Sequence, residues 1–179
     1  MPTRKTAALH RGRLSIPGAT YFATGCIAGR RPVLAGAHGA ALRSIWTELE
    51  WCGDAETLAA TVMPDHFHWL FTLGERLTLG RVLAKFKVQS GRLWNGRIGE
   101  WQRDYFEHRL RENESSESYG FYVFMNPYRS NLIRADQAWP GWHCPRPERF
   151  RFTAVLDAAG RPPPQWLDLP PEDGLHVCE

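Results

Sequence analysis

The feature that most constrains the fold is the alternation in residues 66–73, which read His-Phe-His-Trp-Leu-Phe-Thr-Leu. Successive side chains of a strand point to opposite faces, so His66 and His68 share one face and the aromatic residues that follow each of them share the other. The aromatic face predicts burial against a core. Two imidazoles side by side on the opposite face could hold one divalent cation. The stretch therefore predicts a strand with two candidate metal ligands.

The remaining pattern predicts an α+β fold of the ferredoxin-like, split βαβ type. Its sheet has four antiparallel strands, its two helices cover one face, and the other face is left for function. A third helix, which carries Tyr122, is an addition to that plan, and Pro127 should end it at Asn126 because the residue before a proline avoids α geometry. The pattern predicts strands at 20–27, 57–63, 66–73 and 104–110, and helices at 39–52, 78–93 and 116–126.

The chain of 179 residues divides by composition into three parts. We expect residues 1–16 to form a basic flexible arm, residues 17–135 a folded domain, and residues 136–179 an irregular tail rich in Trp and Pro. Within the tail only residues 151–156 have a strand-like composition. Two alternatives remain open for the tail: it drapes over the domain, or it is partly disordered. Draping would use Trp139, Trp142 and Trp166.

Targeting features are absent from the sequence. No apolar run approaches the ~20 residues of a membrane span. The basic N-terminus is not followed by the apolar core of a signal peptide. The four cysteines are scattered without a C-x-x-C pair, so neither a zinc ribbon nor a disulfide framework is indicated. We therefore expect a cytoplasmic protein, associated with the nucleoid if DNA is its partner.

The net charge of +3 is unevenly distributed. Residues 1–31 contain basic but no acidic residues, and residues 76–111 contain a clear excess of basic residues. Two such blocks on a nearly neutral chain indicate an anionic partner, with nucleic acid first. The alternative is that they are solvated faces balanced by acids nearby in space. The candidate DNA-binding residues are Arg11, Arg13, Arg30, Arg31, Arg81, Lys85, Lys87, Arg92 and Arg103.

A second stretch, residues 119–127, supplies further chemistry. Tyr122 and Asn126 are four residues apart and so share a helix face, with Tyr119 on the same side. If this helix packs beside the histidine strand, Asn126 can offer its amide oxygen as a third metal ligand. Tyr122 is then placed as a nucleophile toward a phosphodiester that is polarised by Mg²⁺ or Mn²⁺.

Each of these residues also has a purely structural interpretation. A lone buried histidine is more often satisfied by backbone groups, and an H-x-H pair alone is a weak signal. Tyr122 could be a core residue of an amphipathic helix. Asn126 could simply end that helix before Pro127. The spacings alone leave both interpretations open.

Residues 63–70, Met-Pro-Asp-His-Phe-His-Trp-Leu, resemble the signature of the single-tyrosine HUH transposases. More narrowly, they resemble the REP-associated tyrosine transposases, bacterial proteins linked to repetitive extragenic palindromes. Residues 122–127 are similar to that family's Tyr-x-x-x-Asn-Pro box. The resemblance covers roughly residues 11–142, with further similar segments at 17–24, 29–34, 85–87, 101–110 and 139–140.

The resemblance implies a HUH nuclease that cleaves single-stranded DNA beside a hairpin. It implies that His66, His68 and Asn126 hold the metal, and that Tyr122 attacks the DNA to leave a 5′-phosphotyrosine and a free 3′-hydroxyl. The chain departs from the family at Asn131, where Gly is usual, and from Ala154 onward it matches no pattern of the family. A monomer and a homodimer are both compatible with the resemblance.

Two other hypotheses remain in addition to a HUH nuclease. The first is a catalytically silent member of the same family that holds hairpin nucleic acid. The second is a metal-dependent hydrolase of a small substrate that uses the H-x-H pair, against which the basic blocks weigh. A Tyr122→Phe variant separates the enzyme from the silent binder.

Overall fold

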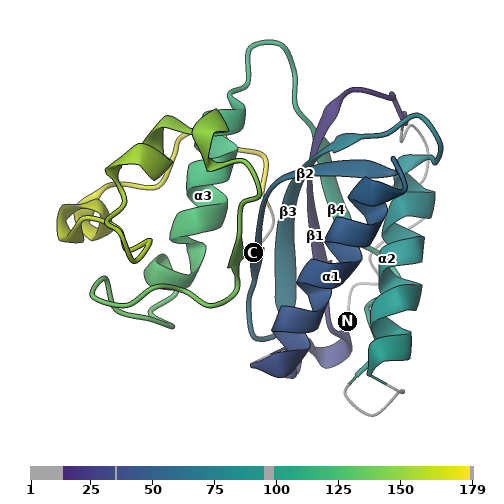
Figure 1. Cartoon of the computed structure of the whole chain (residues 1–179), viewed down its shortest axis with the longest axis horizontal. Coiled ribbons are helices and arrows are strands. Elements are labelled where there is room, and N and C mark those ends of the chain that lie inside the picture. Colours follow the sequence, from purple (N-terminus) through teal and green to yellow (C-terminus); the bar gives the residue numbers. More distant parts are fainter. Residues whose placement is uncertain (1–13, 35, 95–98, 178–179) are drawn as a thin grey trace, which may run out of the picture.

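The computed structural model describes residues 14–34, 36–94 and 99–177, which are built around one antiparallel sheet. Within these residues the sheet has five strands in the order β4-β1-β3-β2-β5 (Figure 1). The strands are β1 (Thr20–Cys26), β2 (Ala55–Val62), β3 (His66–Leu73), β4 (Phe106–Arg109) and β5 (Trp142–His143).

The connections follow the predicted split βαβ plan. Strands β1 and β2 both pair antiparallel with β3, so they run parallel to each other with β3 between them. Helix α1 (Ala37–Trp51) joins them, and helix α2 (Leu79–Leu93) joins β3 to β4 in the same way around β1. The α+β class is thus confirmed. Within the described ranges, no helix combines the length and the apolar character needed to cross a membrane.

The prediction of four strands is wrong, because the tail adds a fifth. Strand β5 pairs with the outer edge of β2, with His143 opposite Ala60 and Trp142 opposite Thr61. Two residues are too few to produce a recognisable alternation in the sequence. The pairing covers an edge that would otherwise be open for contact with another chain.

The strand expected at residues 151–156 is instead a 3-10 helix, Arg151–Val155. The carboxylate of Glu117 accepts the backbone N–H groups of Arg151 and Phe152, both at 2.9 Å. These are N–H groups that a strand would direct to a neighbouring strand. A side chain from a distant helix therefore decides the local structure of this segment.

The first hydrophobic core lies between the sheet and helices α1 and α2. Phe67, Trp69 and Phe71 of β3 enter it, as their alternation predicts, and each is 0% exposed. Both helices present an apolar stripe with helical spacing to it, and every residue of these stripes is at most 3% exposed. The stripes are Leu42, Ile45, Trp46 and Leu49 of α1, and Leu79, Val82, Leu83 and Phe86 of α2.

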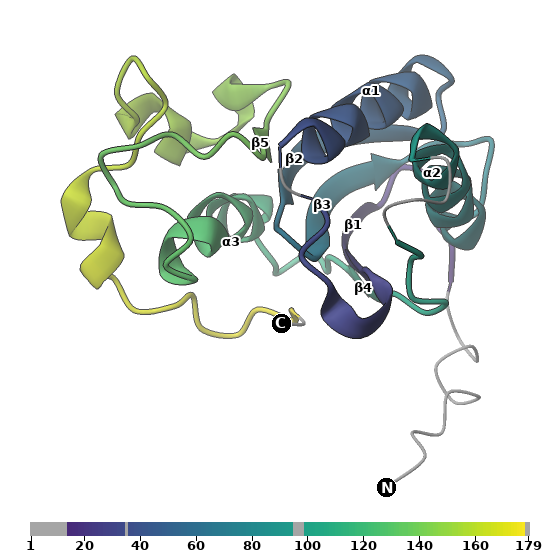
Figure 2. The ribbon, with the colours of Figure 1, turned by 90° about the horizontal axis from the view of Figure 1, so that it is seen from below.

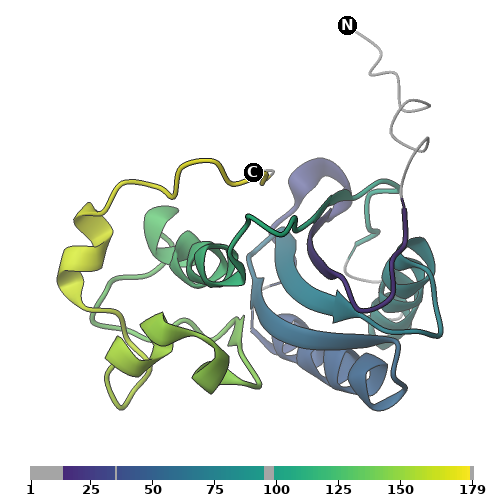
Figure 3. The same ribbon diagram turned by 90° about the horizontal axis from the view of Figure 1, so that it is seen from above.

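A second core lies on the opposite face of the sheet, under helix α3 (Ser116–Arg129). Figures 2 and 3 show the tail folded around α3 on the side away from α1 and α2. Of the two alternatives for the tail, the structure shows draping. The predicted anchors Trp139, Trp142 and Trp166 all pack against this second core.

The prediction that helix α3 ends at Asn126 is wrong, because the helix continues through Pro127 to Arg129. Because Pro127 lies close to the end of the helix, its missing N–H group costs only one backbone hydrogen bond, and few helical residues follow it. The next residue, Tyr128, is 2% exposed and packs on Phe124 with ring centroids 5.6 Å apart. Its hydroxyl donates to the carbonyl oxygen of Gln137 at 3.0 Å. This packing holds the last turn in place.

Substituting Gly120 by Ala should destabilise the protein, although Ala normally favours a helix over Gly by roughly 1 kcal/mol. A Cβ at this position would overlap the ring of Phe150, which is 3% exposed. Overpacking of this kind costs about 1–3 kcal/mol, measurable by urea unfolding. The control is Gly91→Ala in α2, where a Cβ meets nothing within 4 Å. If both variants unfold at the same urea concentration, the overlap with Phe150 does not limit this position.

Candidate functional site

A cavity of about 270 Å³ lies where β3 faces α3. It combines side chains from segments far apart in the sequence, including all four residues predicted to carry the chemistry. Its lining residues are Arg30, His66, His68, Tyr122, Asn126, Arg129, Ser130 and Pro171. A larger and more open hollow of about 590 Å³, bounded by Ala19 and residues 109–113, contains none of those four.

Strand β3 contributes the two histidines. Because its aromatic residues enter the first core, His66 and His68 point to the α3 side, where they are 7% and 0% exposed. Their Nε2 atoms lie 3.1 Å apart. The predicted juxtaposition of the two imidazoles is therefore present, and it is buried rather than open to solvent.

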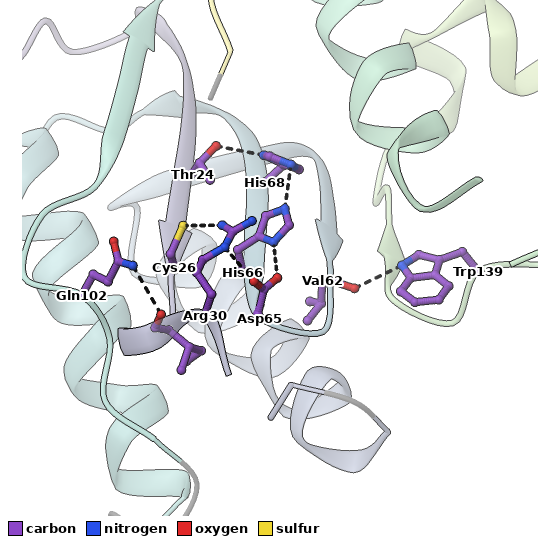
Figure 4. A network of polar contacts seen from close by, with 10 residues as sticks. Thr24, Cys26, Arg30, Val62, Asp65, His66, His68, Gln102 and Trp139 are labelled. Atoms are coloured by element: carbon purple, nitrogen blue, oxygen red, sulfur yellow. Dashed lines mark hydrogen bonds and ion pairs between the residues drawn. The ribbon is translucent and has the colours of Figure 1, made fainter. Parts of the chain in front are cut away.

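Each histidine is held by a partner at its other ring nitrogen (Figure 4). Nδ1 of His66 lies 2.6 Å from Oδ1 of Asp65, whose second oxygen pairs with Nε of Arg30 at 2.7 Å. Nδ1 of His68 lies 2.9 Å from the hydroxyl of Thr24, the residue opposite it on β1. The Asp65 carboxylate accepts a hydrogen bond from the Nδ1–H group of His66, which leaves the Nε2 lone pair of that ring facing His68.

This arrangement fits a divalent cation. If Nδ1 of His68 also donates, to the Thr24 hydroxyl, two Nε2 lone pairs confront each other at 3.1 Å, and a cation bound to both removes the repulsion. No group of three His, Cys, Asp or Glu side chains within residues 14–34, 36–94 and 99–177 could hold a metal ion. A third ligand must then be of another kind. Asn126, 8% exposed in the same cavity, offers an amide oxygen.

Burial keeps both imidazoles neutral. It lowers the pKa of His66, although the Asp65 carboxylate acts in the opposite direction. It lowers the pKa of His68 well below the usual range, with His66 and Arg30 adding to the effect. Neutral imidazole is the form that binds a metal, so neither ring has to lose a proton at pH 7.

Helix α3 contributes Tyr122 from the other side of the cavity. Its ring centroid lies 5.4 Å from that of His68, with the planes at 67°. Tyr119, one turn earlier, is directed elsewhere: its hydroxyl donates to Glu114 at 3.4 Å and accepts the backbone N–H of His176 at 3.1 Å. Although Tyr119 and Tyr122 were expected on the same side of the helix, only Tyr122 of the two lines the cavity.

Of the predicted DNA-binding residues that the structure describes, only Arg30 lines the cavity. Arg11 and Arg13 lie outside the described residues. Arg31 is exposed just after Arg30. Arg103 is exposed between α2 and β4.

Helix α2 lies across the sheet from the cavity, so its four predicted basic residues are remote from His66 and His68 (Figure 1). Lys85 forms an ion pair with Asp54 at 2.6 Å. Lys87 donates to three consecutive backbone carbonyl oxygens, of residues 102–104. Arg81 and Arg92 are exposed. A role of these residues in DNA binding stays a prediction.

Sequence reasoning missed several residues of the site. Asp65 and Thr24 orient the histidines. Thr24 could have been identified only from the strand register, which sets it opposite His68. Arg129 follows Tyr122 by seven residues, two helical turns on the same face. The expected helix end at Asn126 concealed it.

The chain matches a protein-family model described as "Transposase IS200 like" over residues 18–124. The match runs from just before β1 into the middle of α3. It therefore includes the sheet strands β1 to β4, both histidines and Tyr122.

Two curated relatives are similar over part of the chain. A REP-associated tyrosine transposase of Escherichia coli K12 is 26% identical over 132 residues, which cover 72% of this chain and 78% of the relative. A candidate REP-associated tyrosine transposase of Haemophilus influenzae is 25% identical over 99 residues, or 48% of this chain. The match spans only 56% of that relative's length.

One solved structure is similar throughout most of the fold. It is described as a REP-associated tyrosine transposase bound to a REP hairpin, and it superposes on this chain with a TM-score of 0.62. The two chains are 25% identical, and the match covers 73% of this chain and 79% of the solved one.

Proposed function

Because the chain belongs to the IS200-like transposase family, we propose that it cleaves and rejoins single-stranded DNA beside hairpins through a covalent link to Tyr122. Its relatives confirm the resemblance to the REP-associated tyrosine transposases that the motifs indicated.

The observation that carries the proposal is the convergence of His66, His68, Tyr122 and Asn126 on one cavity. The histidines come from the sheet, and the other two come from a helix about sixty residues later in the sequence. Core packing alone does not require two imidazoles whose Nε2 atoms lie 3.1 Å apart, beside a tyrosine and an amide. A site for a cation, a phosphodiester and a nucleophile requires all four.

The donor set suits a hard divalent cation, Mg²⁺ or Mn²⁺. Nε2 of His66, Nε2 of His68 and the amide oxygen of Asn126 would hold it. Bound there, such a cation would act as a Lewis acid toward an oxygen of the phosphodiester. Asp65 and Thr24 fix the imidazoles in position for that role.

The proposed reaction of Tyr122 is a phosphoryl transfer in which one phosphate ester bond replaces another. Its oxygen forms a bond to phosphorus as the bond from phosphorus to the 3′-oxygen of the preceding nucleotide breaks. The phenol gives up its proton to water, and the departing 3′-oxygen takes one up. The phosphotyrosine conserves the energy of the broken ester, so a later 3′-hydroxyl can attack it and restore Tyr122.

Hairpin DNA is the substrate class that the relatives favour, since one of them was solved bound to a REP hairpin. For this chain we propose a hairpin with an adjoining single-stranded segment. The cavity of about 270 Å³ is far smaller than a duplex, which favours a single strand as the segment that places a phosphate beside Tyr122.

The proposal is tested with labelled hairpin oligonucleotides drawn from palindromes that flank the gene. Incubation with Mn²⁺ or Mg²⁺ should yield a protein–DNA adduct that survives a denaturing gel, and excess EDTA should abolish it. Binding without cleavage under either cation would instead favour a silent hairpin-binding protein. An adduct that forms fully in EDTA would contradict the metal dependence.

A further inference from the structure

Arg129 shares the site-facing stripe of α3 with the two residues already assigned chemistry. Tyr122, Asn126 and Arg129 stand at positions i, i+4 and i+7, which lie on one helix face. All three line the cavity. The turn after Pro127 therefore places a guanidinium beside the proposed nucleophile and metal ligands.

The partner of this guanidinium is a carboxylate that binds it through two parallel contacts. Nη1 and Nη2 of Arg129 donate to the two carboxylate oxygens of Glu172 at 2.7 and 3.0 Å. The side chains are only 19% and 17% exposed. The Nε–H of Arg129 is buried and has no hydrogen-bond partner within the described part of the chain. Arg129 thus has donor capacity beyond this ion pair.

Glu172 comes from the last described segment, residues 169–177, here called the C-terminal strap. Figure 2 shows the strap passing under α3 toward β4. Pro171 lines the cavity, and the backbone N–H of His176 donates to the hydroxyl of Tyr119. The His176 ring stacks on that of His108, with centroids 4.6 Å apart. The strap is therefore anchored beyond the cavity and carries an acidic side chain past it.

We propose that Arg129 is a phosphate-binding residue of the site and that Glu172 takes the place of a DNA phosphate when DNA is absent. The proposal rests on the proposed function, since the phosphate is that of the single strand. A phosphodiester offers two oxygens to the same two N–H groups, because the guanidinium fork suits carboxylate and phosphate alike. The other guanidinium at the cavity, Arg30, already pairs with Asp65.

The test measures binding of a fluorescein-labelled hairpin oligonucleotide with a single-stranded extension, by anisotropy in EDTA so that no cleavage intervenes. Arg129→Gln should bind at least tenfold more weakly than the wild-type chain. Glu172→Gln should bind three- to tenfold more tightly, because the phosphate no longer competes with a carboxylate. The double variant should bind as weakly as Arg129→Gln alone.

The salt dependence of binding distinguishes a phosphate contact from a purely structural ion pair, because loss of a structural ion pair would leave it unchanged. Loss of one phosphate contact lowers the slope of log K against log salt concentration by about 0.7 for a single strand. Arg129→Gln should show this change. The matched control is Arg134→Gln, whose ion pair with Asp136 is exposed and outside the cavity, and whose affinity should change less than twofold.

The outcomes separate this proposal from the proposed function. Arg129→Gln binding like the wild-type chain, or Glu172→Gln binding more weakly than it, overturns the role of Arg129 even if the wild-type chain cleaves. A wild-type chain that binds but never cleaves overturns the proposed function alone, and one that does not bind the oligonucleotide overturns both. Thermal melts by circular dichroism establish that each variant is folded.

Discussion

Tyr122→Phe is expected to abolish the covalent protein–DNA adduct and to lower strand cleavage by at least about a thousandfold, because the substitution removes the attacking oxygen. Hairpin binding should stay within about twofold of wild type, since the ring and its packing on Phe22 and His68 remain. The measurements are a denaturing gel for the adduct and anisotropy for binding.

The matched control is Tyr119→Phe, which removes a hydroxyl one turn away. That hydroxyl bonds Glu114 and the backbone of His176, so its loss should lower stability and leave the adduct in place. If the adduct were lost in Tyr119→Phe and kept in Tyr122→Phe, Tyr119 would be the nucleophile, and the proposed site would be refuted.

His68→Ala should weaken Mn²⁺ binding by at least about a hundredfold, a loss to be measured by calorimetry in the absence of DNA. Outer-shell substitutions alone typically cost 10–100-fold in metal affinity, so removal of a direct ligand should cost at least as much. His66→Ala tests the same point at a ring that is 7% rather than 0% exposed, and so carries less risk to folding.

The control for both variants is His143→Ala. His143 is also a half-buried imidazole with a pKa lowered by burial, but it lies on β5 and stacks on Trp46, away from the cavity. Its substitution should leave Mn²⁺ affinity unchanged. Wild-type Mn²⁺ affinity in both His66→Ala and His68→Ala would mean that the imidazole pair holds no metal.

What could be predicted from the sequence was local and periodic. The alternation in β3 determined which side chains enter the first core, and thereby that His66 and His68 share the other face. The stripes of α1 and α2 followed from helical spacing in the same way. The encounter of Tyr122 and Asn126 with the histidines was conditional on packing, which no spacing specifies.

What could not be predicted depends on contacts between distant segments. Glu117 bonds the backbone of Arg151 and Phe152 and converts an expected strand into a helical turn. Burial of Tyr128 outweighs the local preference of Pro127 to end a helix, and this is why Arg129 escaped notice. In each case a tertiary contact overrides a local preference.

Because the two halves of the site belong to different structural layers, they can diverge separately in evolution. The histidines are fixed in the sheet, whereas Tyr122, Asn126 and Arg129 belong to a helix supported by the tail through contacts such as Gly120 with Phe150. Substitutions in the tail can shift α3 against the sheet and so retune turnover while every site residue is conserved. The proposed activity can therefore change through substitutions in the tail that alter neither histidine nor Tyr122.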